Sequence, residues 1–153
     1  MPVWPPFSHS FSLVTISVFG LGYVGAVTSG CLSQIGHQII GVDVHEPKVR
    51  AFNEGRSPIV EPELDDMLQS ACRERRLRAT TNAAEAVAAS TISIICVGTP
   101  SLPSGSLDLG YVTHVTQQIA AALRQQGKQH IVIFRSTMLP GSTRKMVAEQ
   151  FAD

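Results

Sequence analysis

The chain has 153 residues, of which 44% are apolar, so it is long enough to build one domain with its own core and too short for two full domains. Twelve basic and twelve acidic residues leave no net charge and form no long basic run, which makes nucleic acid a poor candidate partner. No apolar run approaches the roughly 18 residues that span a bilayer, so we expect a soluble protein without a membrane partner.

The N-terminal residues and the cysteines bear on the location of the protein. Residues 1–13 contain three prolines and no basic stretch followed by a long apolar run, so we expect a disordered extension and no secretory signal. Cys31, Cys72 and Cys96 are widely spaced and form no paired CxxC motif, which favours a reducing, cytoplasmic setting. Only 16% of the residues are charged, below the usual value of about 25%, which suggests that something outside this chain covers part of the surface.

From Val14 onward, short β-rich apolar runs alternate with amphipathic stretches, which is typical of a parallel sheet with helices on both faces. The expected strands are 14–19, 38–44, 76–81, 91–97 and 130–136. The nearly continuous apolar character of 92–97 and 131–134 predicts that both are central strands, buried on their two faces. The predicted fold class is therefore α/β, a Rossmann-type doubly wound and mostly parallel sheet.

Helices are expected between these strands, over 23–35, 46–54, 61–76, 110–126 and from Ser142 onward. The first has apolar residues at helical spacing, which predicts a packed face made of Val24, Val27, Cys31, Leu32 and Ile35. In the helix over 110–126, the neighbouring residues Gln117 and Gln118 are interpreted as solvated.

A GxGxxG motif, Gly20 to Gly25, lies directly after the first strand and directly before the first helix. Gly20 permits the tight turn, Gly22 lets the backbone approach a pyrophosphate, and Gly25 allows close packing of helix and strand. The free N–H groups and the dipole at the start of the helix then favour an anion. The motif predicts dinucleotide binding, although three glycines in a turn can also be no more than a tight connection.

Asp43 follows the second strand, where this fold places an acid that accepts hydrogen bonds from the adenosine ribose. Its charge would repel a 2′-phosphate, so NAD is preferred to NADP, while Lys48 and Arg50 could partly offset that repulsion. The alternative is that Asp43 only caps the helix over 46–54.

Four segments resemble the nucleotide-sugar 6-dehydrogenases, the UDP-glucose and GDP-mannose dehydrogenase family. They are FGLGYVGAV (19–27), SPIVEPEL (57–64), ICVGTPS with LDLGY (95–101 and 107–111), and RSTMLPGS (135–142). The segments SPIVEPEL, CVGTPS and RSTMLPG are more similar to the GDP-mannose branch than to the UDP-glucose branch. The resemblance covers residues 14–153 and implies the NAD-binding domain, truncated before the central and sugar-binding domains.

The resemblance also implies residue roles. Tyr23, Val24, Asp43 and Lys48 would contact the adenosine half of NAD, and Thr99 and Thr137 would lie along the cofactor towards the nicotinamide. For the two threonines the alternative is a hydroxyl that bonds the backbone of its own turn.

Enzymes of this family oxidise C6 of a nucleotide sugar to a carboxylate in two NAD-dependent steps, with a cysteine nucleophile that belongs to a later domain. The resemblance therefore implies no catalytic residue in this chain, a structural role for its three cysteines, and a nucleotide-sugar partner and a homo-oligomer only at full length. The histidines show no metal-ligand spacing, so no metal site is assigned. Two alternatives remain: the N-terminal domain of a 6-phosphogluconate or β-hydroxyacid dehydrogenase, and a non-catalytic NAD-binding or oligomerisation module.

Overall fold

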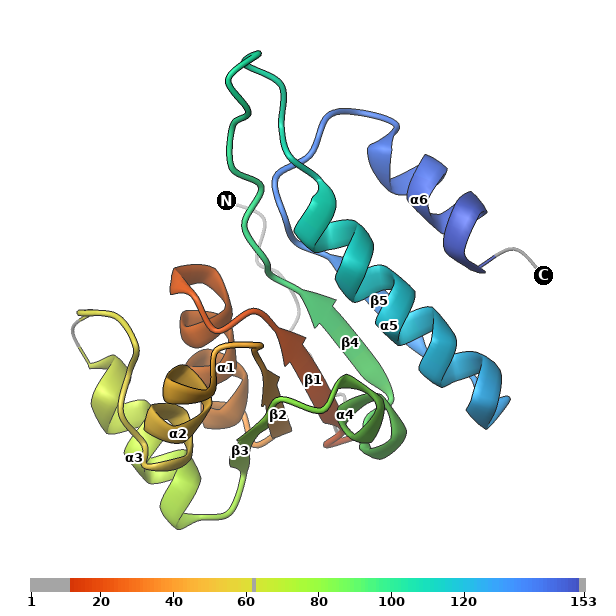
Figure 1. The fold of residues 1–153 in the computed structure, drawn as a ribbon. Helices are drawn as coiled ribbons and strands as arrows, with labels where there is room; N and C mark the ends of the chain where they lie inside the picture. The colour runs from red at the N-terminus through yellow and green to blue at the C-terminus, as the bar shows by residue number, and fades with distance from the viewer. Residues whose placement is uncertain (1–11, 62, 152–153) are drawn as a thin grey trace, which may run out of the picture.

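A computed structural model describes residues 12–61 and 63–151 and shows one parallel sheet with helices on both faces (Figure 1). The strands are β1 (Thr15–Phe19), β2 (Gln38–Val42), β3 (Leu77–Thr80), β4 (Ile92–Ile95) and β5 (Ile131–Phe134). All paired strands are parallel, and their order across the sheet is β3-β2-β1-β4-β5. This is the strand order of the Rossmann-type fold, which confirms the predicted fold class. Of the expected N-terminal extension, residues 1–11 lie outside the described residues.

Two groups of helices cover the sheet. One face packs against α1 (Tyr23–Gln34), α2 (Glu46–Asn53) and α3 (Leu64–Arg73). The other face packs against α4 (Ala83–Ala89), α5 (Gly110–Gln126) and α6 (Ser142–Phe151). Each face has its own core of buried apolar side chains, because successive residues of a strand point to opposite faces. In the described part of the chain, no helix is long and apolar enough to cross a membrane.

The packed face of α1 is not the one expected. Its buried residues are small, namely Gly25, Ala26, Ser29, Gly30 and Ser33. By contrast, Val24 is 39% exposed, and both Cys31 and Ile35 are exposed. A Cβ on Gly30 would lie 2.8 Å from Leu64 Cδ1, so α1 approaches its neighbours too closely for large side chains. Only Val27 and Leu32 of the expected face pack against the core.

The prediction that β5 is a central strand is also wrong. β5 pairs with β4 but forms an edge of the described sheet. Val132 and Phe134 pack into the core beneath α5 and α6, while Ile131 is 58% exposed and Ile133 is 42% exposed. The strand is apolar on both faces, but within residues 12–61 and 63–151 only one face is covered.

Candidate functional site

The turn between β1 and α1 is built from glycines at the carboxyl edge of the sheet. Gly20 has a φ of +93°, and its N–H donates to the carbonyl of Val42 at the end of β2 over 2.8 Å. A Cβ on Gly25 would lie 1.8 Å from the carbonyl oxygen of Gly20, so only glycine allows the helix to fold back onto the turn. These two positions are therefore fixed by the fold itself.

Gly22 has a different environment. It is the N-cap of α1 in an extended conformation, and apart from its two chain neighbours no described residue lies within 4 Å of the place where a Cβ would be. Among the described residues no side chain caps this end of the helix, and its first turn carries no acidic residue. The unpaired N–H groups of the first turn and the positive end of the helix dipole therefore face open space, which is an arrangement that binds anions.

The Asp43 carboxylate joins the glycine turn to the end of β2. Its Oδ2 accepts a hydrogen bond from the N–H of Leu21 at 2.8 Å, and its Oδ1 accepts one from the N–H of His45 at 2.9 Å. Lys48 Nζ lies 3.7 Å from Oδ2, and the Asp43 side chain is only 9% exposed. Asp43 is not the N-cap of α2, since that position belongs to His45. The carboxylate is thus held at the turn, with its Lys48 partner beside it.

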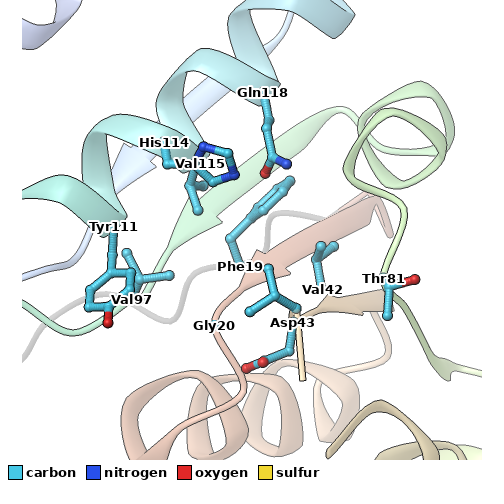
Figure 2. A pocket seen from close by; sticks show the side chains of 11 residues that line it. Phe19, Gly20, Val42, Asp43, Thr81, Val97, Tyr111, His114, Val115 and Gln118 are labelled. Atoms are coloured by element: carbon cyan, nitrogen blue, oxygen red, sulfur yellow. The ribbon is translucent and has the colours of Figure 1, made fainter. Parts of the chain in front are cut away.

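A cavity of about 90 Å³ opens next to Asp43, between the ends of β1, β2 and β4 and the face of α5 (Figure 2). Its apolar walls come from Phe19, Val42, Val44, Val97 and Val115. Polar groups reach it from Asp43, Thr81, Tyr111, His114 and Gln118. The two glutamines that were interpreted as solvated differ in their surroundings, because Gln117 is exposed whereas Gln118 is half-buried and lines the cavity.

The two threonines expected along the cofactor lie next to each other. The Thr99 hydroxyl donates to the backbone carbonyl of Thr137 over 2.8 Å, and this bond links the loops that follow β4 and β5. The Thr99 hydroxyl therefore bonds across two loops and not within its own turn. Ser136 strengthens the link, because its hydroxyl donates to the carbonyl of Val97 over 2.6 Å.

Glu61 was not predicted as part of the site. The hydroxyl of Tyr23, in the first turn of α1, donates to Glu61 Oε2 over 3.0 Å. This hydrogen bond and the nearby negative charge raise the pKa of Tyr23. The bond connects the SPIVEPEL segment, which the resemblance singled out without assigning it a role, to the glycine turn.

The cysteines have three different environments. Cys31 is exposed on α1, which corrects the expectation that it lies on the packed face. Burial raises the pKa of the half-buried Cys72, and it also raises that of the buried Cys96, where Arg135 and Thr28 offset part of the effect. In the part of the chain that the structure describes, no group of His, Cys, Asp and Glu side chains could hold a metal ion.

Comparison with known proteins identifies the family. The sequence profile described as "UDP-glucose/GDP-mannose dehydrogenase family, NAD binding domain" matches residues 14–153. The chain belongs to this family. It corresponds to the NAD-binding domain of these dehydrogenases, so its cofactor is NAD.

Individual members of the UDP-glucose/GDP-mannose dehydrogenase family agree with this assignment. The chain is 50% identical to GDP-mannose 6-dehydrogenase of Azotobacter vinelandii over 132 residues, which cover 86% of the chain and 30% of that protein. It is 36% identical to a UDP-glucose 6-dehydrogenase of Bacillus subtilis over 132 residues, 86% of the chain and 28% of that protein. A crystal structure of a ternary complex of GDP-mannose dehydrogenase from Pseudomonas aeruginosa superposes with a TM-score of 0.87 at 50% identity. That superposition covers 89% of this chain and 31% of the other, so the chain spans about a third of its relatives.

Proposed function

We propose that NAD lies along the carboxyl edge of the sheet, with its adenosine in the cavity beside Asp43 and its pyrophosphate at the N-terminus of α1. The observation that carries this proposal is the 2.8 Å hydrogen bond from Leu21 N–H to Asp43 Oδ2, which fixes a carboxylate between the cavity and the glycine turn. A carboxylate in that position accepts hydrogen bonds from ribose hydroxyls and repels a 2′-phosphate. NAD is therefore preferred to NADP, with Lys48 as the cation that accompanies the charge.

Other residues of the site are proposed to bind the pyrophosphate and the nicotinamide half of the cofactor. The N–H groups of Tyr23 and Val24 belong to the open first turn of α1 and are placed to bind the pyrophosphate. Thr99 and Thr137, joined by their hydrogen bond, form the rim along which the nicotinamide half extends. When bound, NAD supplies a hydride acceptor, while this chain holds and orients it.

The whole enzyme is proposed to be a nucleotide-sugar 6-dehydrogenase that converts a C6 alcohol to a carboxylate, with the catalytic cysteine in a later domain. GDP-mannose is favoured over UDP-glucose because the chain is 50% identical to one GDP-mannose 6-dehydrogenase and 36% identical to one UDP-glucose 6-dehydrogenase over the same length. Cytoplasmic location, a role in polysaccharide biosynthesis and a homo-oligomeric state at full length are part of the same proposal. Residues 14–153 form its cofactor domain. The family match removes the support for a 6-phosphogluconate or β-hydroxyacid dehydrogenase.

Replacing Gly22 by alanine tests the pyrophosphate position. A Cβ at Gly22 would meet no described atom beyond those of the two neighbouring residues, and the φ of −80° suits alanine. The Gly22→Ala protein is therefore expected to unfold at the same temperature as the wild type or slightly higher. Its methyl group would project into the space proposed for the pyrophosphate, so NADH should bind at least about tenfold more weakly in calorimetry.

Gly25→Ala provides the contrast, because its Cβ would collide with the Gly20 carbonyl and the variant should unfold at a lower temperature. If the Gly22→Ala protein is fully folded and binds NADH as tightly as the wild type does, the pyrophosphate does not lie at this turn.

A further inference from the structure

Two polar side chains of α5, His114 and Gln118, face the cavity beside Asp43. They are four residues apart, so they lie on the same face of the helix, one turn above the other. Figure 2 shows both pointing from α5 towards Phe19, with Asp43 on the other side of that ring. Gln117, which precedes Gln118 in the chain, does not line the cavity and is exposed.

The lining of the cavity suits a planar, uncharged ring with a polar edge. Phe19 and four valines provide apolar surface, and the described lining contains one acidic residue, Asp43, and neither lysine nor arginine. With the ribose held at Asp43, as proposed above, the base on its C1′ extends into the cavity and its far edge approaches α5. At that end, His114 and Gln118 can each offer a hydrogen-bond donor and an acceptor, but the two ring nitrogens of a histidine point in diverging directions. The oxygen and the NH2 group of the Gln118 amide lie side by side, so this side chain can pair with two neighbouring atoms on the edge of a base.

The chemistry of the Gln118 amide favours adenine over other purines. Its carbonyl oxygen can accept a hydrogen bond from the 6-amino group, and its NH2 group can donate to the neighbouring ring nitrogen N7, which is the pairing that glutamine makes with adenine in DNA recognition. A base with a carbonyl at C6 presents two acceptors at the same edge. These acceptors are the C6 carbonyl oxygen and N7. The Gln118 NH2 group can donate to one of the two, and in either orientation of the amide the Gln118 carbonyl oxygen then faces the other acceptor.

Within residues 12–61 and 63–151, the Gln118 side-chain amide is not engaged in any hydrogen bond with another residue. Its donor and acceptor are therefore available to a ligand. We propose that Gln118 is a specificity-determining residue of the cofactor site, which recognises the 6-amino group of the adenine of NAD.

This inference rests on the proposed placement of the adenosine, and its test uses two ligands that differ only at that group. NAD and nicotinamide hypoxanthine dinucleotide, in which the 6-amino group is replaced by a carbonyl, are titrated into the full chain by calorimetry. The wild type should bind NAD about tenfold more tightly than the hypoxanthine analogue.

Three variants make the test specific. Gln118→Leu keeps the size of the side chain but removes its polar atoms, so the two ligands should bind with affinities equal to within about twofold. Gln118→Glu keeps the acceptor for the 6-amino group and lacks a donor, so the preference for NAD over the analogue should be retained or increased. Gln117→Leu is the matched control, and it should bind both ligands as the wild type does.

The outcomes separate the inference from the proposed function. If the wild type binds neither ligand, the proposed site for NAD is wrong, and the inference falls with it. If the wild type binds NAD and the analogue equally well, or if Gln118→Leu keeps the wild-type preference, NAD binding stands and the role of Gln118 is refuted.

Discussion

Among single residues, Asp43 is the one proposed to set the preference for NAD over NADP. Removing its carboxylate in Asp43→Ala eliminates the charge that opposes a 2′-phosphate and leaves Lys48 to attract one, so the ratio of the two affinities should shift towards NADPH by about tenfold. The variant should also unfold at a lower temperature, because the N–H groups of Leu21 and His45 lose their acceptor.

Calorimetry with NADH and NADPH on wild type and variant measures this shift. Glu54→Ala removes an exposed carboxylate that is paired with Arg56, and it should leave both affinities unchanged. Equal affinity of the wild-type protein for the two cofactors would refute the role given to Asp43.

The positions of the glycine turn and of the acid after the second strand could be predicted, because a short motif fixes them, while their contacts with NAD stay a prediction. Glu61 and Gln118 were missed for different reasons. Glu61 contacts Tyr23, which is 38 positions away, and nothing in the local sequence indicates that pairing. Gln118 and Gln117 differ only in the face of α5 on which they lie, and that distinction requires the position of the helix on the sheet.

At the scale of elements, a chain of hydroxyl groups joins β1, β4 and the start of β5 on the side of α4. Ser90 Oγ donates to Ser17 Oγ over 3.0 Å, Ser17 and Ser93 share a hydrogen bond of 2.7 Å, and Ser93 Oγ lies 2.8 Å from His130 Nε2. Burial lowers the pKa of His130, and the nearby charge of Lys128 adds to this effect. The folded protein therefore resists protonation of this ring more than the unfolded chain does.

This network predicts a loss of stability in mild acid. Above the ordinary histidine pKa of about 6.5, His130 is neutral in both states and costs nothing. As the pH falls through that value towards the lower folded pKa, the unfolded chain takes up the proton first, and the free energy of unfolding decreases. Urea unfolding between roughly pH 5 and pH 8 measures this effect. The free energy of unfolding should decrease less with falling pH for His130→Asn than for the wild type.

His45→Asn, at an exposed position, is the control and should keep the wild-type dependence. Identical pH profiles for wild type and His130→Asn would show that the ring is not linked to folding in this way.

Hydrophobic runs and turn residues predicted the order and type of most helices and strands. They did not predict which face of a helix is packed or which strand lies at the edge of the sheet. The helix α4 was missed because it has seven residues and is rich in alanine, although Asn82 with Glu85 three positions later forms a capping pair that could have indicated its start. The face of α1 was wrong because tight packing selected glycine, alanine and serine over larger apolar residues. The edge position of β5 depends on which strands lie beside it, which no pattern within the strand records.

At the scale of the whole molecule, the chain is expected to bind NAD without oxidising a sugar. Cys96 is buried with a raised pKa, Cys72 lies in α3, and Cys31 lies on the outside of α1, so no thiol stands at the rim formed by Thr99 and Thr137 in the described part of the chain. With NAD and either GDP-mannose or UDP-glucose, absorbance of NADH should stay at the level of a sample without protein. NADH formation that disappears in Cys96→Ala would show that the thiols were assigned wrongly.

This domain is proposed to hold the adenosine half of NAD at the glycine turn and Asp43. Titration of one sample with NAD and with ADP-ribose, which lacks the nicotinamide, tests that placement. Because the proposed contacts lie mainly at the adenosine end, both ligands should bind at one site with dissociation constants within about tenfold, or about 1.4 kcal/mol. Absence of ADP-ribose binding, or NAD binding a hundredfold more tightly than ADP-ribose, would refute this placement and put the main contacts at the nicotinamide end.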